Sequence, residues 1–302
     1  MQNSNLSEER ISFGDLLPEH TFYIIRRMPL GAGLFSNFLY VYGHLLYALE
    51  KGYIPVIDMQ NYKTYFNETE LINDTNNAWE YYFCQPLHYT LQDIQYAKNV
   101  ILSSSFYLFD KVPEFLHKTS DINNYHSVIT KYLQFNDITK QYIREQQQKL
   151  FNNKSKILGV KYRGTDYKSE STAGGHFVPA SLSDCVAKTK DLLKEWGMEW
   201  IYLSTEESAA VECFRQTFGD ILIVTDSYRI EHYDAAMGGS VSVEFNRQHD
   251  NYLKGLEYIA DTVLLSECDA LIASKNNGSY AAIGLNNNRY KNKFIFDLGR
   301  HL

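Results

Sequence analysis

Four short apolar segments in the second half of the sequence each end in a polar stretch that could bind a nucleotide. Arginine offers a planar fork of donors that suits a diphosphate, and carboxylates can accept hydrogen bonds from ribose hydroxyls or from a base. One polar stretch after a strand is an ordinary turn, but several at one sheet edge would suit a nucleotide-sized ligand. In chain order the stretches are Arg163-Gly164-Thr165-Asp166, Ser204-Thr205-Glu206-Glu207, Thr225-Asp226-Ser227 and Ser274-Lys275-Asn276-Asn277-Gly278-Ser279.

The segments that precede these polar stretches predict a parallel β-sheet. They are short and nearly all apolar, and stretches with i, i+3, i+4 apolar spacing separate them, which indicates helices on both faces of the sheet. Ser274–Ser279 also opens a predicted helix, whose first N–H groups could bind phosphate oxygens. The predicted strands are 157–162, 200–203, 221–224, 270–273 and 294–296, and the predicted helices include 182–193, 209–218 and 253–264.

The N-terminal half opens with a predicted βαβ unit. A strand is predicted at Thr21–Arg27, and a glycine-rich turn leads from it into a helix with Asn37 or Ser36 as its N-cap and Gly52 at its end. The turn either faces a ligand or is a plain tight turn, since it matches neither the dinucleotide fingerprint nor a P-loop. The residues of the turn that could face a ligand are Gly31, Gly33 and Asn37.

The sequence also predicts two domains. Residues 61–99 are polar and aromatic and predict no element, whereas 100–104 predicts a strand and 121–151 a helical stretch. Asn152-Asn153-Lys154-Ser155 is the most linker-like segment of the chain. We therefore predict an N-terminal domain over 1–152 and a C-terminal domain over 153–302.

Composition narrows the possible functions. The chain has 302 residues, 44% of them hydrophobic, and a net charge of −7 without a basic run, so a nucleic-acid partner is not expected. The sequence has a polar start and no apolar run of about 18 residues, so neither a signal peptide nor a transmembrane segment is predicted. We therefore expect a cytoplasmic protein. Its oligomeric state is left open.

Cysteine and acidic patterns give no sign of a metal site. The cysteines are far apart and lie mostly in apolar periodic segments, which favours buried free thiols over disulfides or a zinc site. The sequence contains neither a His-Glu-x-x-His motif nor an Asp-x-Asp pair that could hold a divalent ion against a diphosphate. We therefore expect no metal. The cysteines are Cys84, Cys185, Cys213 and Cys268.

Four segments of the chain resemble motifs of one enzyme superfamily. Val160–Asp166 resembles the His-x-Arg-Arg-Thr/Gly-Asp motif of the GDP-fucose-dependent α-1,6 and protein O-fucosyltransferases. Ile201–Glu207 is similar to the second motif of this superfamily and Gly255–Ser279 to the third, and Gly31–Asn37 looks like its N-terminal glycine-rich loop. The sequence departs from the pattern at Lys161, where the family has histidine, and at Gly164, where many members have a second arginine.

The resemblance implies an α/β protein with the GT-B fold, in which two Rossmann-like domains with parallel sheets face each other across a cleft. It implies an inverting, metal-independent transfer of fucose from GDP-fucose to a glycan acceptor, with no further cofactor. The donor would bind the C-terminal domain and the acceptor the N-terminal one. The residues assigned to the donor are Lys161, Arg163, Thr165, Asp166, Ser204, Glu206, Asp226, Asp261, Ser274, Asn276, Gly278 and Ser279.

The resemblance also assigns roles to individual residues. Arg163 would hold the β-phosphate and stabilise the departing GDP, the alternative being a structural arginine in an ion pair. Glu206 would contact the ribose, Asp261 the guanine and Ser274 the phosphates. For Asp261, which follows Glu257 by one helical turn, the alternative is a solvated helix face.

Three residues could serve as the general base that takes the proton of the acceptor hydroxyl. Glu170 is the candidate that we choose, although Asp166 also follows the strand closely and His176, in a glycine-rich loop, is a third option. Asp166 could instead cap the next turn. Two other readings stay open, namely a glycosyltransferase for another nucleotide sugar and a degenerate GT-B protein that binds a nucleotide or glycan without catalysis.

Overall fold

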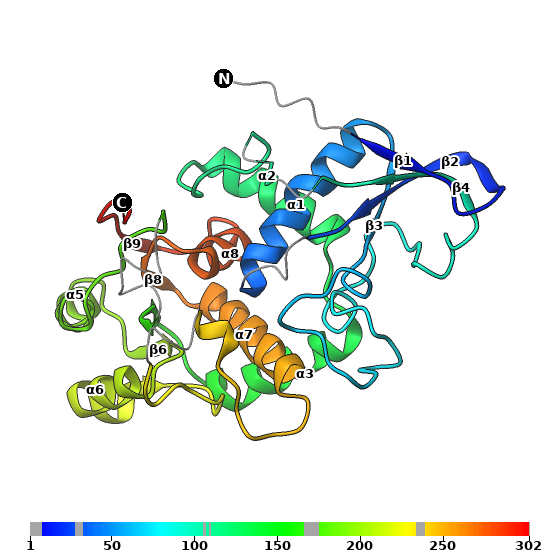
Figure 1. Cartoon of the computed structure of the whole chain (residues 1–302). Coiled ribbons are helices and arrows are strands. Elements are labelled where there is room, and N and C mark those ends of the chain that lie inside the picture. The colour runs from blue at the N-terminus through cyan, green and yellow to red at the C-terminus, as the bar shows by residue number, and fades with distance from the viewer. Residues whose placement is uncertain are drawn as a thin grey trace. The chain divides into compact units, whose positions relative to one another are not determined.

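The structure is a computed structural model that describes residues 8–27, 33–104, 107–108, 110–165, 175–233 and 239–301. The chain divides into two compact units (Figure 1). The N-terminal unit comprises Met1–Glu114 and Asn124–Thr139, and the C-terminal unit comprises Phe115–Asn123 and Lys140–Leu302. This division differs from the predicted boundary at residue 152 because most of helix α3 (Asp137–Phe151) belongs to the C-terminal unit.

The N-terminal unit contains a four-stranded sheet in the order β1-β4-β2-β3. Strand β2 pairs in parallel with both β3 and β4, and helix α1 follows β2 and precedes β3, which confirms the predicted βαβ unit. Strand β1, which is short and polar and was not predicted, pairs antiparallel with β4 at the edge. The bounds are β1 Glu9–Ile11, β2 Leu16–Ile25, α1 Leu34–Glu50, β3 Ile54–Ile57 and β4 Ala97–Leu102.

Helix α1 begins three residues before the predicted start. Its N-cap is Gly33 and no side chain caps it, so the prediction of Asn37 or Ser36 as N-cap is wrong. Leu34 and Phe35 are both buried, and this burial extends the helix toward the N-terminus because it brings two more apolar side chains into the core. Ser36 and Asn37 therefore lie within the first turns of α1.

Polar side chains support the long segment between β3 and β4, in which the sequence predicts no element. The Ile57 N–H donates to Gln85 Oε1 at 2.8 Å, and Gln85 Nε2 donates back to the Ile57 carbonyl at 2.9 Å. Asn77 Oδ1 accepts from the Met59 N–H at 3.0 Å. These amide side chains satisfy backbone groups at the carboxyl end of β3 that a further strand would otherwise bind.

The predicted helical stretch 121–151 is two helices, α2 (Thr119–Tyr132) and α3. Between them, Asn136 Oδ1 accepts from the Thr139 N–H at 2.9 Å, which is the geometry of an N-cap.

The C-terminal unit contains a five-stranded, fully parallel sheet in the order β7-β6-β5-β8-β9, as the alternating pattern predicts. The first strand of the unit, β5, is central, and the chain direction across the sheet reverses between β5 and β8. Ligands of open α/β sheets bind at such a switch point. The strands are β5 Ile157–Lys161, β6 Trp200–Ser204, β7 Leu222–Ile223, β8 Ala270–Ser274 and β9 Asn292–Phe296.

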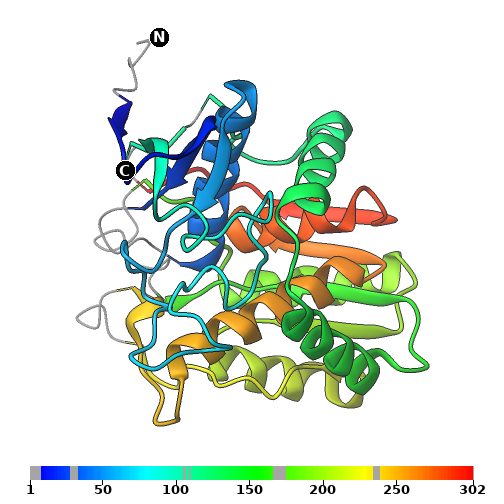
Figure 2. The same cartoon turned by 90° about the vertical axis from the view of Figure 1, so that its right-hand side faces the viewer.

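Helices cover both faces of this sheet. Figure 1 shows α5 and α6 on one side of the strands and α7 and α8 on the other, and Figure 2 shows α7 in front of the strands. Gly159 lets α7 approach β5 closely, because a Cβ there would lie 2.8 Å from Leu265. The elements are α5 Leu182–Glu195, α6 Ser208–Phe218, α7 Asp250–Glu267, α8 Asn277–Asn286 and the 3₁₀ turns η2 Gly219–Ile221 and η4 Ser240–Ser242.

The described residues bear on two expectations from the sequence, namely free cysteines and the lack of a membrane-spanning helix. All four cysteines are free, as predicted, and Cys185 and Cys268 are buried. No helix within the described ranges is both long and apolar enough to cross a membrane.

The core of the C-terminal sheet yields a stability prediction. Ile272 in interior strand β8 has 0% of its surface exposed, whereas Leu298 is 51% exposed. Ile272→Ala should lower the free energy of unfolding by about 2–5 kcal/mol, because it leaves a cavity in the core. Leu298→Ala should change it by less than about 0.5 kcal/mol. Urea unfolding of both variants checks this, and equal effects would contradict the described core.

Candidate functional site

The carboxyl ends of β5, β6 and β8 bring the predicted polar residues of the C-terminal unit together. The parallel register places Lys161 opposite Ser204 on one side and opposite Ala273 on the other. The polar residues that follow these positions therefore lie at one edge of the sheet, beside its switch point.

Three donors from the turn after β5 converge on one carboxylate oxygen, Oε1 of Glu206. Arg163 Nη1 lies 3.0 Å from it, the Gly164 N–H donates at 3.0 Å, and the Thr165 hydroxyl donates at 3.1 Å. Arg163 Nη2 also donates to the Ser240 hydroxyl at 2.8 Å. The guanidinium thus has a fixed direction, and its side chain is 18% exposed.

The surroundings of Glu206 keep it ionised. Burial alone would raise the pKa of its carboxyl, but the charges of Arg163 and Lys161 and the N–H of Gly164 outweigh burial and lower it. Glu206 therefore supplies a negative charge beside Arg163 at neutral pH.

Glu207 fills the place of a side chain at position 164. A Cβ on Gly164 would lie 2.2 Å from Glu207 Oε1, and this oxygen accepts from the Thr165 N–H at 2.6 Å. Thr165 has a φ of 51°, a left-handed conformation that costs a β-branched residue about 1–3 kcal/mol. A second arginine, as in the family motif, would not fit here without displacement of Glu207.

A buried polar network lies behind Arg163 and centres on Asp261. Oδ2 of Asp261 accepts from the Ser204 hydroxyl at 2.5 Å, and Oδ1 accepts from Tyr202 at 2.6 Å and from Thr225 at 3.2 Å. Lys161 Nζ donates to Ser204 at 2.9 Å. Asp261 is only 7% exposed, so it does not lie on a solvated helix face.

Lys161, which replaces the histidine of the family motif, belongs to this network. It is 4% exposed, and burial lowers the pKa of its ammonium group, although Asp261 and Glu206 oppose this. Its Nζ lies 4.8 Å from the centre of the Tyr258 ring. The Tyr258 hydroxyl in turn approaches Gly278 so closely that a Cβ there would lie 2.4 Å from it.

The start of α8 forms the remaining wall of the site. Asn276 is its N-cap and accepts from the Ser279 N–H at 2.9 Å, and the Ser279 hydroxyl donates to the Ser274 carbonyl at 2.8 Å. The Ser274 hydroxyl accepts from the Ala180 N–H at 3.0 Å. These contacts hold the first turn of α8 beside the switch point, as a phosphate site would require.

The structure does not bring all predicted residues to this edge. The Asp226 carboxylate is 80% exposed and pairs with Lys149 of α3. Asp166 and Glu170 lie outside the described residues, as does Gly31 of the N-terminal loop. Within the described ranges, no group of three or more His, Cys, Asp and Glu side chains could hold a metal ion.

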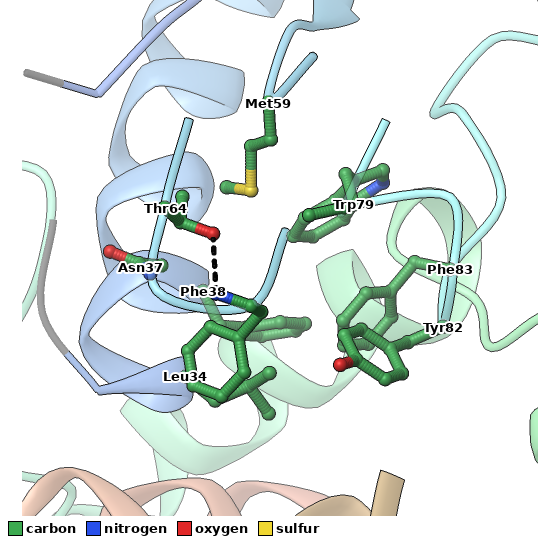
Figure 3. A pocket seen from close by; sticks show the side chains of 10 residues that line it. Leu34, Asn37, Phe38, Met59, Thr64, Trp79, Tyr82 and Phe83 are labelled. Carbon is green, nitrogen blue, oxygen red and sulfur yellow. Dashed lines mark hydrogen bonds between the residues drawn. The ribbon is translucent and has the colours of Figure 1, made fainter. Parts of the chain in front are cut away.

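Gly33 and Asn37 belong to the N-terminal unit. Gly33 is the N-cap of α1, and Asn37, 4% exposed, borders a small hollow (Figure 3). Half of the residues that line the hollow are buried aromatic residues, among which Trp79 and Phe83 stack at 4.3 Å between centroids. Such a lining is typical of a gap in core packing. The lining residues are Leu34, Asn37, Phe38, Met59, Thr64, Phe66, Ala78, Trp79, Tyr82 and Phe83.

Sequence reasoning missed two residues of the site, Glu207 and Ser240. Glu207 was quoted only as part of a polar stretch, yet it fixes the backbone of the turn after β5. A glycine directly after the key arginine was a possible signal, because glycine often marks a place where another group approaches the backbone. Ser240 lies in η4, far from any predicted strand end.

Comparison with known proteins identifies the fold. No protein-family model matches the sequence, and no curated protein is detectably similar to it in sequence. Fucosyltransferase NodZ from Bradyrhizobium is similar in structure, with a TM-score of 0.52 and 13% identity over 93% of this chain and 96% of NodZ. NodZ alpha-1,6-fucosyltransferase soaked with GDP-fucose gives a TM-score of 0.51, again at 13% identity, over 88% of this chain and 92% of NodZ.

The chain is therefore an α/β protein with the GT-B fold. More particularly, its fold is that of the fucosyltransferase NodZ, as expected from the resemblance of its sequence motifs.

The contact between Gly164 and Glu207 yields a prediction. Gly164→Ala should lower the free energy of unfolding by about 1–3 kcal/mol, because the new methyl group overlaps the Glu207 carboxylate. In a Glu207→Ala background the same change should cost clearly less. Glu207→Ala alone is the reference for this comparison. Additive effects of the two site substitutions in urea unfolding would show that the side chains do not meet.

Glu206 yields a prediction about pH. Its pKa is lowered on folding, so its contribution to stability is present above the unfolded pKa of about 4.3 and is lost as pH falls through the folded pKa. Glu206→Gln should therefore destabilise the protein more at pH 7 than at pH 3. Urea unfolding of both proteins at the two pH values tests this, and a constant difference would contradict the assigned ion pair.

Proposed function

We propose that the protein is a glycosyltransferase that moves fucose from GDP-fucose to a glycan acceptor. The observation that carries the proposal is Arg163, fixed beside the switch point at the carboxyl end of central strand β5. Support comes from the fold shared with a NodZ structure soaked with GDP-fucose and from the sequence motifs around Arg163. The proposed reaction inverts the anomeric centre and requires no metal.

In the proposed reaction, an acceptor hydroxyl oxygen bonds to the anomeric carbon while the bond from this carbon to the diphosphate oxygen breaks. Negative charge grows on the leaving GDP, and the Arg163 fork stabilises it. Glu206 and Ser240 hold this fork before the substrate arrives, so little reorganisation accompanies the reaction. We assign the acceptor proton to the Glu170 carboxylate.

The other residues of this edge would bind the rest of the donor. The first turn of α8, with Ser274, Asn276, Gly278 and Ser279, would meet the phosphates. The Glu206 carboxylate, whose Oε1 accepts from Arg163, Gly164 and Thr165, would meet a ribose hydroxyl.

The buried network around Asp261 suggests that some residues predicted to bind the donor instead support the strands. Asp261, Ser204 and Lys161 already satisfy one another, so we assign them to the support of β5 and β6 rather than to a first contact with guanine. Thr165 supports the Arg163 turn in the same way. Asp226 would reach a donor only after release from Lys149.

A second candidate is a GT-B protein that binds a nucleotide without transferring a sugar. The observation that favours it is the Glu207 carboxylate, which occupies the place where the family motif has a second arginine. The site would then hold a diphosphate with fewer positive charges.

Nucleotide titration tests the leading proposal. Calorimetry without added metal should show binding of GDP in preference to UDP and ADP, and Arg163→Ala should abolish most of this binding. Transfer from GDP-fucose should fall by about 10²–10³, because a preorganised donor to the leaving group is lost. Arg215→Ala, at a residue whose side chain is 58% exposed on α6, is the control.

The outcomes separate the candidates. GDP binding without transfer to any glycan in an acceptor screen would favour the non-catalytic candidate. Unchanged GDP affinity in Arg163→Ala would rule out the proposed site.

A further inference from the structure

Two consecutive arginines at the carboxyl end of β2 have different surroundings. Arg26 is fully engaged: its guanidinium donates to Glu9 at 2.8 Å, to the Tyr62 hydroxyl at 3.0 Å and to the Ser103 carbonyl at 3.1 Å. These contacts tie β2 to β1 and β4. The neighbouring Arg27 makes none of them.

Arg27 is partly buried without a counter-charge. Its guanidinium has only long contacts of 3.5 Å to the carbonyl and hydroxyl of Ser36, and it lies 4.9 Å from the centre of the Tyr40 ring. No carboxylate in the described part of the chain pairs with it. The parts of the N-terminal unit outside the described ranges contain no Asp or Glu in the sequence, so none of them can supply the missing charge.

The surroundings of Arg27 favour an anion. Burial lowers the pKa of the guanidinium, and the nearby Tyr40 and Tyr107 oppose this only in part. Helix α1, whose positive end lies beside it, has no acidic residue in its first turn and no side-chain cap. A positive charge and a positive helix end thus lie together, and no carboxylate of the described residues pairs with either of them.

Arg27 lies where ligands of open α/β sheets usually bind. In the order β1-β4-β2-β3, the chain direction reverses between β2 and β4, so the carboxyl ends of these strands form the switch point of this sheet. The Tyr40 ring beneath the guanidinium is held firmly, because its hydroxyl donates to the Arg26 carbonyl at 2.8 Å or to the Ser104 carbonyl at 2.6 Å.

We propose that Arg27 and the Ser36 hydroxyl form an anion-binding subsite of the N-terminal unit, which takes one phosphate or carboxylate group of a substrate. The subsite does not depend on Arg163 or on sugar transfer. Where the proposed function holds, the oxyanion belongs either to the donor diphosphate or to an acidic sugar of the acceptor.

The pair of arginines supplies the first test. Arg26→Gln should lower the melting temperature, because it leaves Glu9 and a strand carbonyl without their partner. Arg27→Gln should leave the melting temperature unchanged or raise it, because it removes a partly desolvated charge that no described carboxylate pairs with. Equal losses of melting temperature in the two variants would overturn the proposal, since Arg27 would then be a structural residue.

Binding supplies the second test. Wild type, Arg27→Gln and the charge control Arg10→Gln, at a residue whose side chain is 68% exposed, are titrated with inorganic phosphate, GDP, glucuronate and neutral glucose. The titrations are repeated with the three proteins in an Arg163→Ala background. At least one anionic probe should bind at least tenfold more weakly after Arg27→Gln, and not after Arg10→Gln.

The probes identify the source of the anion. A loss confined to GDP and phosphate assigns the subsite to the donor, and a loss of the preference for glucuronate over glucose assigns it to an acidic acceptor. Equal affinities of wild type and Arg27→Gln for every probe, or no binding of any probe, would overturn the proposal. The Arg163→Ala background separates this result from a failure of the nucleotide site, because phosphate or glucuronate binding would persist there.

Discussion

A single oxygen atom, Oε1 of Glu206, organises the polar edge of the C-terminal sheet. An arginine fork, a peptide N–H and a hydroxyl from consecutive residues all meet it, so the turn after β5 has one favoured arrangement. The contact requires that β5 and β6 end at the same level, which their parallel register ensures by placing Lys161 opposite Ser204. The position of Arg163 therefore follows from strand pairing and not from the flexible side chain alone.

Two neighbouring carboxylates have separate tasks at this edge. Glu206 balances the charge of Arg163, whereas Glu207 holds the Thr165 N–H and occupies the volume beside Gly164. This second contact maintains a left-handed threonine, which would relax without its partner. The arrangement also limits the positive charge of the turn, because Arg163 faces the Glu206 carboxylate. A diphosphate would therefore depend strongly on the geometry of Arg163, since excess positive charge could not replace a misplaced donor.

The sequence predicts the C-terminal fold well because the relevant signals are local. Short apolar strands and one-sided helices need only their own residues to be recognised, and parallel sheets follow from their alternation. The short polar strand β1 carries no such signal, since its pairing with β4 is a tertiary contact. The start of α1 was misplaced for a related reason, because burial of Leu34 and Phe35 outweighs a polar cap.

In the site, the strand ends were predictable but side-chain directions were not. Asp226 follows β7 as expected, yet its exposed carboxylate pairs with Lys149 of α3.

The arginines of the two sheets differ in their charge partners, a difference that sequence motifs do not reveal. Each sheet has arginine side chains after the strand at its switch point, so position alone would give them equal weight. Arg163 and Arg26 have carboxylate partners and are stable in the absence of a ligand. Arg27 has none in the described part of the chain, and its charge is partly desolvated. An unbalanced, partly buried cation weakens the folded state unless something compensates it, and neither packing nor strand pairing explains why an arginine occupies that position. A ligand that carries the missing negative charge does explain it.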